Sequence, residues 1–106
     1  MVTFSCLRMG KNTMMRNEME AMIKTEFRSL ALKTRARFDI TQEQMAERLA
    51  MGIRSYVDIE SGVCMCGTLT ALLLLMDQPD PSAVLADLKA KFKKLYEAYE
   101  TEGMPR

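Results

Sequence analysis

The sequence predicts an all-α fold, a compact bundle of four to five helices, and three observations lead to it. Along most of the chain, apolar residues recur at spacings of three and four, the period of an amphipathic helix. No segment shows the strict alternation of apolar and polar residues, or the Asn-Gly type of turn, that predicts strands and hairpins. Of the 106 residues, 48% are hydrophobic and 27% are charged, which suits one globular domain with a modest core.

The first helix is expected to run from about Asn17 to Arg37. Its apolar residues share one stripe because they lie three or four positions apart: Met19, Met22, Ile23, Phe27, Leu30 and Ala31. Residues 1–17 before it show no clear apolar period, so we expect a poorly ordered arm there. Several methionines follow Met1 closely, and the sequence does not say which of them is the true translation start.

Residues 41–62 predict two short helices joined by a tight turn. Thr41 and Gln44 have the spacing of a capping box, in which the hydroxyl accepts from the Gln44 amide and the Gln44 side chain accepts from the Thr41 amide. Three residues of the helix that follows are expected to face inward: Met45, Ala46 and Leu49.

The turn covers Ala50 to Gly52, and the next helix is predicted from Ile53 to Ser61. Tyr56 and Ile59 are three residues apart, so we expect them to form its buried face. Gly62 follows the helix, at a position where a positive φ is easiest for glycine.

Two more helices are predicted in the last part of the chain. The residues from Leu69 to Met76 are apolar all round, so this helix is either the central one of the domain or meets a partner subunit on one side. Asp80 is a good N-cap and Pro81 fits the first position of a helix that continues to about Tyr99. The predicted organisation is an arm (1–17), a helix-turn-helix domain (18–78), a C-terminal helix that is a candidate dimerisation element (79–100) and a frayed tail (101–106).

This chain lacks the residues that several classes of function require. There is no histidine, no glycine-rich phosphate loop and no nucleophile with a histidine base, so we do not expect an enzyme. Cys6, Cys64 and Cys66 do not have zinc spacing, and no metal or cofactor is expected. Their odd number, without an apolar leader, favours reduced thiols in the cytoplasm. The longest apolar run, Ala71 to Met76, is far below the roughly 20 residues that cross a bilayer, so we expect no membrane contact.

The residues on both sides of the predicted turn carry a resemblance to a known family. Ile40 to Leu49 looks like a scaffold helix, and Arg54-Ser55-Tyr56 with Asp58 to Gly62 looks like the end of a recognition helix. In this order and spacing they resemble the lambda-repressor/Cro-type (XRE-like) helix-turn-helix family, and are similar to small regulators of clostridia-like bacteria and their mobile elements. The resemblance covers roughly Met22 to Met76, about half of the chain.

The resemblance implies a compact helical DNA-binding domain, usually dimeric, that regulates transcription. Gln42 would meet a phosphate or an adjacent side chain, and Ser55 would reach a backbone phosphate. Four residues would face the major groove: Ile53, Arg54, Val57 and Asp58. Among them Arg54 is the strong base contact, since it can pair bidentately with guanine. The alternative for Arg54 is a solvated side chain or a partner of Glu60.

The charge of the chain is a weak basis for binding nucleic acid. The net charge is only +1, so DNA binding would depend on local patches and on two subunits acting together. Three basic residues near the end of the first helix are candidates for phosphate contact: Lys33, Arg35 and Arg37. The alternative is that they belong to a solvated helix end, where cations also interact favourably with the helix dipole. Residues 1–17, if not simply disordered, could act as a basic arm on the DNA backbone. Glu60 is expected to pair with an arginine such as Arg48 or Arg54.

The sequence also departs from the family pattern. Ala50 stands where the family often has glycine, and a left-handed conformation there would cost roughly 1 kcal/mol. Gly52 stands where the family prefers serine, so the next helix lacks a capping side chain. The near-neutral charge and the apolar pair Ile53 and Val57 favour an alternative function, a protein-interaction or inhibitor module on the same scaffold.

Self-association is expected through the last helix, with help from the helix before it. The predicted dimer contact consists of Leu85, Leu88, Phe92, Leu95 and Tyr99. The expected partners are double-stranded DNA, a second copy of the chain and, in the alternative function, another protein.

Overall fold

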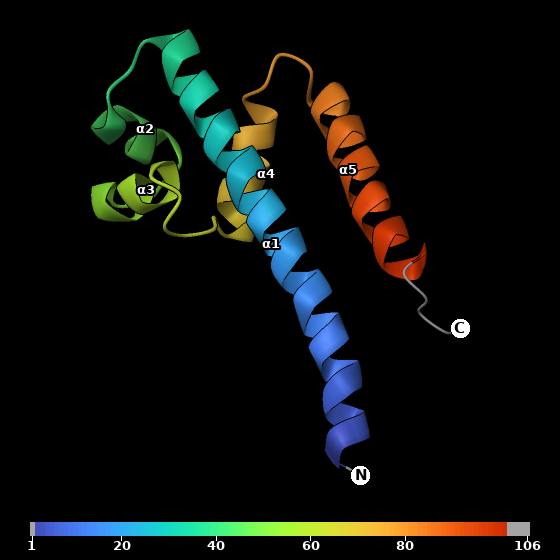
Figure 1. Cartoon of the computed structure of the whole chain (residues 1–106). Helices are drawn as coiled ribbons and strands as arrows, with labels where there is room; N and C mark the ends of the chain where they lie inside the picture. Colours follow the sequence, from blue (N-terminus) through green and yellow to red (C-terminus); the bar gives the residue numbers. More distant parts are fainter. Residues whose placement is uncertain (1, 102–106) are drawn as a thin grey trace.

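Five helices follow one another in this computed structural model, which describes residues 2–101 and, within them, the side chains of residues 13–99. They are α1 (Val2–Phe38), α2 (Gln42–Arg48), α3 (Ile53–Glu60), α4 (Thr68–Met76) and α5 (Pro81–Thr101). The described residues contain no strand, which confirms the predicted all-α bundle. Figure 1 shows α2 and α3 on one side of the C-terminal half of α1, with α4 behind α1 and α5 running antiparallel beside it.

Helix α1 begins much earlier than predicted. It starts at Val2 rather than near Asn17, so residues 2–17 of the expected poorly ordered arm (1–17) are helical. The segment has no proline, and its Gly10 costs a helix only about 1 kcal/mol, so the helix formed downstream can continue backward through it. Of the predicted tail, residues 101–106, only Thr101 is described, as the last residue of α5.

The core lies where α2, α3 and α4 meet the C-terminal half of α1. Tyr56 and Ile59 of α3 are buried, as predicted, and so is the small Ala46 of α2. The other members of this buried cluster are Phe27, Leu30, Ala31, Met45, Leu49, Cys66, Leu74 and Leu88. The cluster therefore draws on all five helices and on the loop between α3 and α4.

Local backbone geometry sets the path from α2 to α3. The capping box is present: the Gln44 amide donates to Thr41 Oγ1 at 3.1 Å, and the Thr41 amide donates to Gln44 Oε1 at 2.9 Å. Ala50 has a φ of 55°, so it adopts the left-handed conformation at the position where the family often has glycine. Gly62 has a φ of 84° after α3, as predicted. Gly52 precedes α3 with no side-chain cap, also as predicted.

Helix α4 is buried on one side only. Leu74 faces the core and is fully buried, while the opposite side of the helix carries Leu69, Leu72 and Met76, which are more than half exposed. Helix α4 is thus not a central helix covered on all sides, the first of the two alternatives, and an apolar face remains uncovered. Even so, no described helix has both the length and the apolar character needed to cross a membrane.

Candidate nucleic-acid interface

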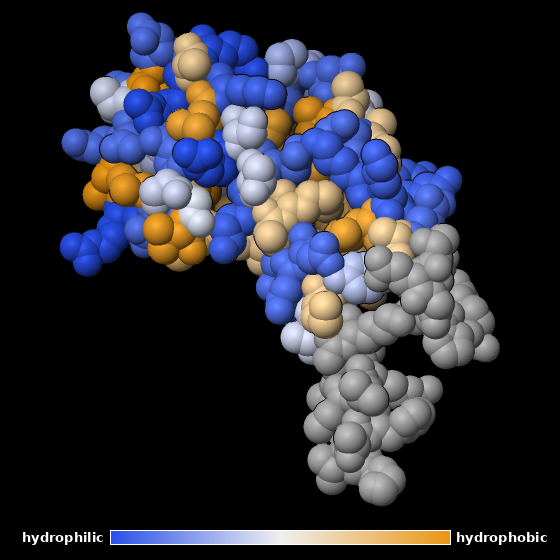
Figure 2. Space-filling view, in the orientation of Figure 1, coloured by the Kyte–Doolittle hydropathy of each residue, from blue (hydrophilic) through white to orange (hydrophobic). Residues whose placement is uncertain are grey.

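The first turn of α3 projects from the molecule while the rest of the helix is anchored. Ile53, Arg54 and Ser55 are exposed, whereas Val57 and Asp58 are half-buried. The anchors, Tyr56 and Ile59, pack into the core on the other side of the helix. The predicted groove-facing residues are therefore presented most fully at the N-terminal end of α3. In Figure 2, the surface at the left, where α2 and α3 lie, shows small separate hydrophobic patches among hydrophilic residues.

Glu60, the last residue of α3, is the centre of a hydrogen-bond network that joins three helices. Arg35 Nη1 of α1 donates to its two carboxylate oxygens at 2.7 and 2.6 Å. Gln42 Nε2 of α2 donates to Oε1 at 2.7 Å. Tyr56 Oη, one turn earlier in α3, donates to Oε2 at 2.6 Å. This Glu60 network sets the orientation of α3 against α1 and α2.

Two more bonds close the same corner of the fold. Arg35 Nε donates to the carbonyl of Ile40 at 3.1 Å, which secures the turn after α1. Arg28 Nε donates to the backbone carbonyl of Glu60 at 2.6 Å, and so satisfies an acceptor at the end of α3. The prediction that Glu60 pairs with an arginine is confirmed, but the arginines are Arg35 and Arg28 rather than the named examples Arg48 and Arg54.

The network shifts the pKa values of its members. Burial raises the pKa of the Glu60 carboxyl, but the hydrogen bonds from Tyr56, Arg35 and Gln42, with the charge of Arg35, outweigh burial and leave the pKa below its usual value. Burial and the nearby Glu60 carboxylate raise the pKa of the Tyr56 hydroxyl. The bond to Glu60 also raises the pKa of Arg35. Around neutral pH the network therefore has a charged carboxylate, a charged guanidinium and a neutral phenol.

Gln42 and Arg35, both predicted to contact phosphate, are held by this network. Gln42 meets an adjacent side chain, the second of the two contacts expected for it. Arg35 is occupied on both Nε and Nη1, and its side chain is 31% exposed. Both side chains are thus oriented by Glu60 rather than free in solvent.

Arg37 belongs to a second cluster, where the C-terminal ends of α1, α2 and α4 meet. Arg48 of α2 pairs bidentately with the Asp77 carboxylate, at 2.9 and 3.0 Å. Arg37 donates to the backbone carbonyl of the same Asp77. Both guanidinium groups also lie over the ring of Phe38, with Arg48 4.2 Å and Arg37 4.8 Å from its centroid.

The predicted phosphate-contacting cations do not converge on the exposed first turn of α3. Arg35 points to Glu60 and Arg37 to Asp77, as described above. Lys33 is exposed, but two residues along a helix correspond to a rotation of about 200°, so it points away from the side where Arg35 lies. Arg54 is thus left as the exposed cation on the first turn of α3.

Helix α5 packs against α1 and uses part of its predicted dimer contact for this purpose. Leu88 and Tyr99 are buried, and the Tyr99 hydroxyl donates to Glu18. Lys91 pairs with Glu26 of α1 at 2.6 Å and with Asp87 at 3.0 Å, and the first of these ion pairs joins α5 to α1.

The prediction for α5 therefore needs correction. Leu88 and Tyr99 are not available to a partner, because an amphipathic helix buries its stripe against the nearest apolar surface, here α1. Phe92 and Leu95 are half-buried, and Leu85 is exposed. Only part of the predicted dimer contact remains on the surface.

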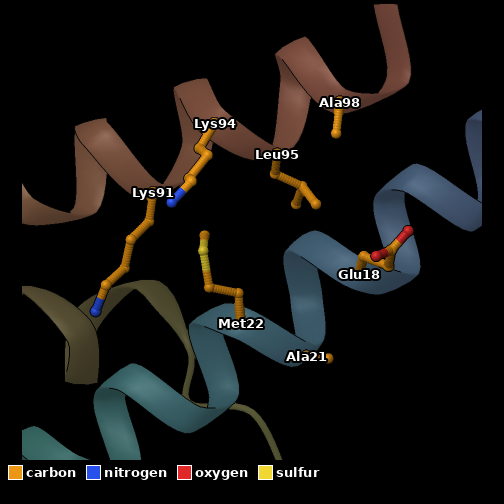
Figure 3. Close-up of a pocket in the computed structure, with 7 residues that line it drawn as sticks. All are labelled: Glu18, Ala21, Met22, Lys91, Lys94, Leu95 and Ala98. Atoms are coloured by element: carbon orange, nitrogen blue, oxygen red, sulfur yellow. The ribbon is translucent and has the colours of Figure 1, made fainter. Parts of the chain in front are cut away.

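A groove of about 540 Å³ lies between α1 and α5 (Figure 3). Leu95 and Ala98 of α5 point toward α1, where Met22 and Glu18 line the opposite wall, and Lys94 stands over the groove. No residue of α2 or α3 lines this groove, so it is separate from the candidate interface. Among the described residues, no cluster of cysteine and carboxylate side chains could hold a metal ion.

Comparison of the chain with models of protein families, with curated proteins and with solved structures finds no match. The resemblance to a helix-turn-helix family therefore rests on the residues of this chain and on their arrangement.

Proposed function

We propose that this chain is a DNA-binding transcriptional regulator that places α3 in the major groove of duplex DNA and acts as a homodimer. The supporting observation is that α3 has an exposed first turn and is held in place along the rest of its length. Its first turn projects, while Tyr56, Ile59 and the Glu60 network hold its other side and its far end. A rigidly held helix with an exposed N-terminal turn is the arrangement in which helix-turn-helix proteins contact base edges.

The exposed turn carries side chains with suitable chemistry. Arg54 can donate two hydrogen bonds to guanine, Ser55 can donate to a phosphate, and Ile53 can contact a thymine methyl group. Asp58 is one turn after Arg54 and half-buried, so it would accept from cytosine or stay clear of the phosphates. Specificity in this proposal depends mainly on Arg54.

A second candidate function is a protein-interaction or inhibitor module on the same scaffold. It is favoured by the cations around the motif: Arg28, Arg35, Arg37 and Arg48 all bind acceptors within the fold. A DNA-binding domain usually turns such cations toward the phosphates, and the net charge of +1 does not compensate for their loss.

A salt titration separates the two functions. The full chain would be titrated against random duplex DNA and against duplex DNA from upstream of its own gene, at a series of salt concentrations. The DNA-binding proposal expects tighter binding to the upstream duplex and an affinity for both that falls steeply with salt, because phosphate contacts release counterions. Folded protein that binds neither duplex at the lowest salt would contradict the proposal and favour the protein-interaction module.

A further inference from the structure

Helix α4 has an uncovered apolar face. From Thr68 to Met76 the helix has no charged residue. Leu69, Leu72 and Met76 are 62, 53 and 74% exposed, and all three lie on the side opposite the fully buried Leu74. We call these three residues the α4 stripe.

The surface around the stripe is large enough to bind a partner. The loop that leads into α4 carries two more exposed apolar side chains, Val63 and Met65. If each of the five presents on the order of 100 Å², they offer roughly 500 Å² per chain, within the range of the largest and often functional patches on monomers. Two such surfaces would bury about 1,000 Å², the lower end for a specific interface.

We propose that the α4 stripe is the surface through which two copies of this chain associate, with the two α4 helices packed antiparallel about a twofold axis. The occupant is a second copy because the stripe is complementary to itself. Leu72 lies three residues after Leu69 and four before Met76. An axis beside Leu72 therefore sets Leu69 of one chain against Met76 of the partner subunit, and brings the two Leu72 side chains together. Such a contact is isologous, the type found in most homodimers.

The electrostatics of the two candidate helices lead to the same choice. A neutral stripe can be buried by a copy of itself without desolvating any charge. Leu85, the exposed apolar residue of the predicted α5 contact, has Lys89 one turn further along the same side of the helix, and Lys89 is exposed. A dimer through α5 would bring this charge to the contact or bury it, which is costly unless it is paired.

This inference deepens the proposed function, since it names the contact of the homodimer that the proposal assumes. It rests on that proposal only for its role in DNA binding. The association itself can be measured without DNA, so either idea can fail while the other stands.

The test is the oligomeric state of the full chain, measured by sedimentation equilibrium over a wide concentration range without DNA. Leu72→Glu is the test variant and Leu85→Glu the matched control, since the two leucines are 53 and 52% exposed. We expect a wild-type dimer whose dissociation constant rises by about a hundredfold in Leu72→Glu, because apolar contact is lost and two carboxylates meet at the axis. Leu85→Glu should stay dimeric.

A second measurement does not depend on how well Leu72→Glu folds. In a Cys6→Ser, Cys64→Ser background, Leu72→Cys should form a disulfide-linked dimer on mild oxidation, and Leu85→Cys should not. A monomeric wild-type chain would overturn the proposal, as would a dimer that dissociates in Leu85→Glu but not in Leu72→Glu, or cross-linking through position 85 alone.

Discussion

The Tyr56 hydroxyl donates a hydrogen bond to the carboxylate of Glu60, one turn further along α3, with 2.6 Å between Oη and Oε2. The ring of Tyr56 is fully buried in the core, so the carboxylate at the end of α3 is bound to a side chain that cannot move freely. Arg35 and Gln42 then tie α1 and α2 to the same carboxylate. Tyr56 thus has two roles: its buried ring anchors α3 in the core, and its hydroxyl positions the Glu60 carboxylate that orients α3 against α1 and α2.

Replacing Glu60 by glutamine should lower the free energy of unfolding by about 2 kcal/mol. Glutamine has the same shape, but it loses the charge that strengthens the bonds from Arg35, Gln42 and Tyr56. The measurement is urea unfolding followed by circular dichroism. Glu47→Gln is the matched control, because Glu47 is exposed on α2. Equal stability of the two variants would contradict the role given to Glu60.

The same carboxylate should make stability depend on pH. Because the folded-state pKa of Glu60 lies below the ordinary glutamate value of about 4.3, its contribution is complete above that value and is lost as the pH falls through the folded-state pKa. The difference in unfolding free energy between wild type and Glu60→Gln should therefore shrink in acid. A difference that stays constant from neutral pH down to acid unfolding would rule this out.

Ala50→Gly should stabilise the protein by about 1 kcal/mol. Ala50 has a φ of 55°, where the Cβ atom is strained and glycine is not. The same substitution at the exposed Ala90, inside α5, should destabilise by a similar amount, because glycine is a poor helix former. Thermal unfolding of both variants tests the pair, and a destabilising Ala50→Gly would mean that the turn is not strained.

A buried polar pair between α1 and the loop after α4 leads to another prediction. Gln78 Nε2 donates to Thr34 Oγ1 at 2.9 Å and to the Leu74 carbonyl at 2.8 Å. Thr34→Val keeps the shape but removes one acceptor, and should cost about 1–2 kcal/mol of stability. Thr25→Val, at an exposed position of α1, should be nearly neutral. Chemical unfolding compares them, and an equally neutral Thr34→Val would show that the bond contributes nothing.

Arg54→Ala should weaken binding to a specific duplex site by about 1–3 kcal/mol, as expected for a bidentate contact to guanine. Arg16→Ala is the control, since Arg16 is also exposed but lies on α1 and pairs with Glu20. Electrophoretic mobility shift or fluorescence anisotropy would give both affinities. Equal affinities would leave Arg54 as a solvated side chain.

Much of the fold could be predicted because its signals are local. The capping box of Thr41 and Gln44, and the Asp80-Pro81 start of α5, each depend on residues within one helical turn. The buried face of Tyr56 and Ile59 follows from their spacing. The start of α1 could not be placed, since its first residues lack the apolar period from which helices are recognised.

The contacts of the candidate site were harder to predict, because they join residues far apart in the sequence. Tyr56 and Glu60 have helix spacing, and this signal could have been noticed. Arg35 and Glu60 are 25 positions apart, and their pairing depends on how α1 is rotated about its own axis. The sequence offers several arginines for this role, and only the packing of α1 on α3 selects among them. Contact of Arg54, Ser55 and Ile53 with DNA stays a prediction.

Helix α2 is tied to its surroundings at both ends, through Gln42 to Glu60 and through Arg48 to Asp77. With seven residues it is well below the length at which an isolated helix persists in water. The segment of α2 and α3 should therefore not keep its structure as an isolated peptide or when grafted onto another protein. A host scaffold would also have to supply the acceptor at Asp77 and the arginine that shares the Glu60 carboxylate.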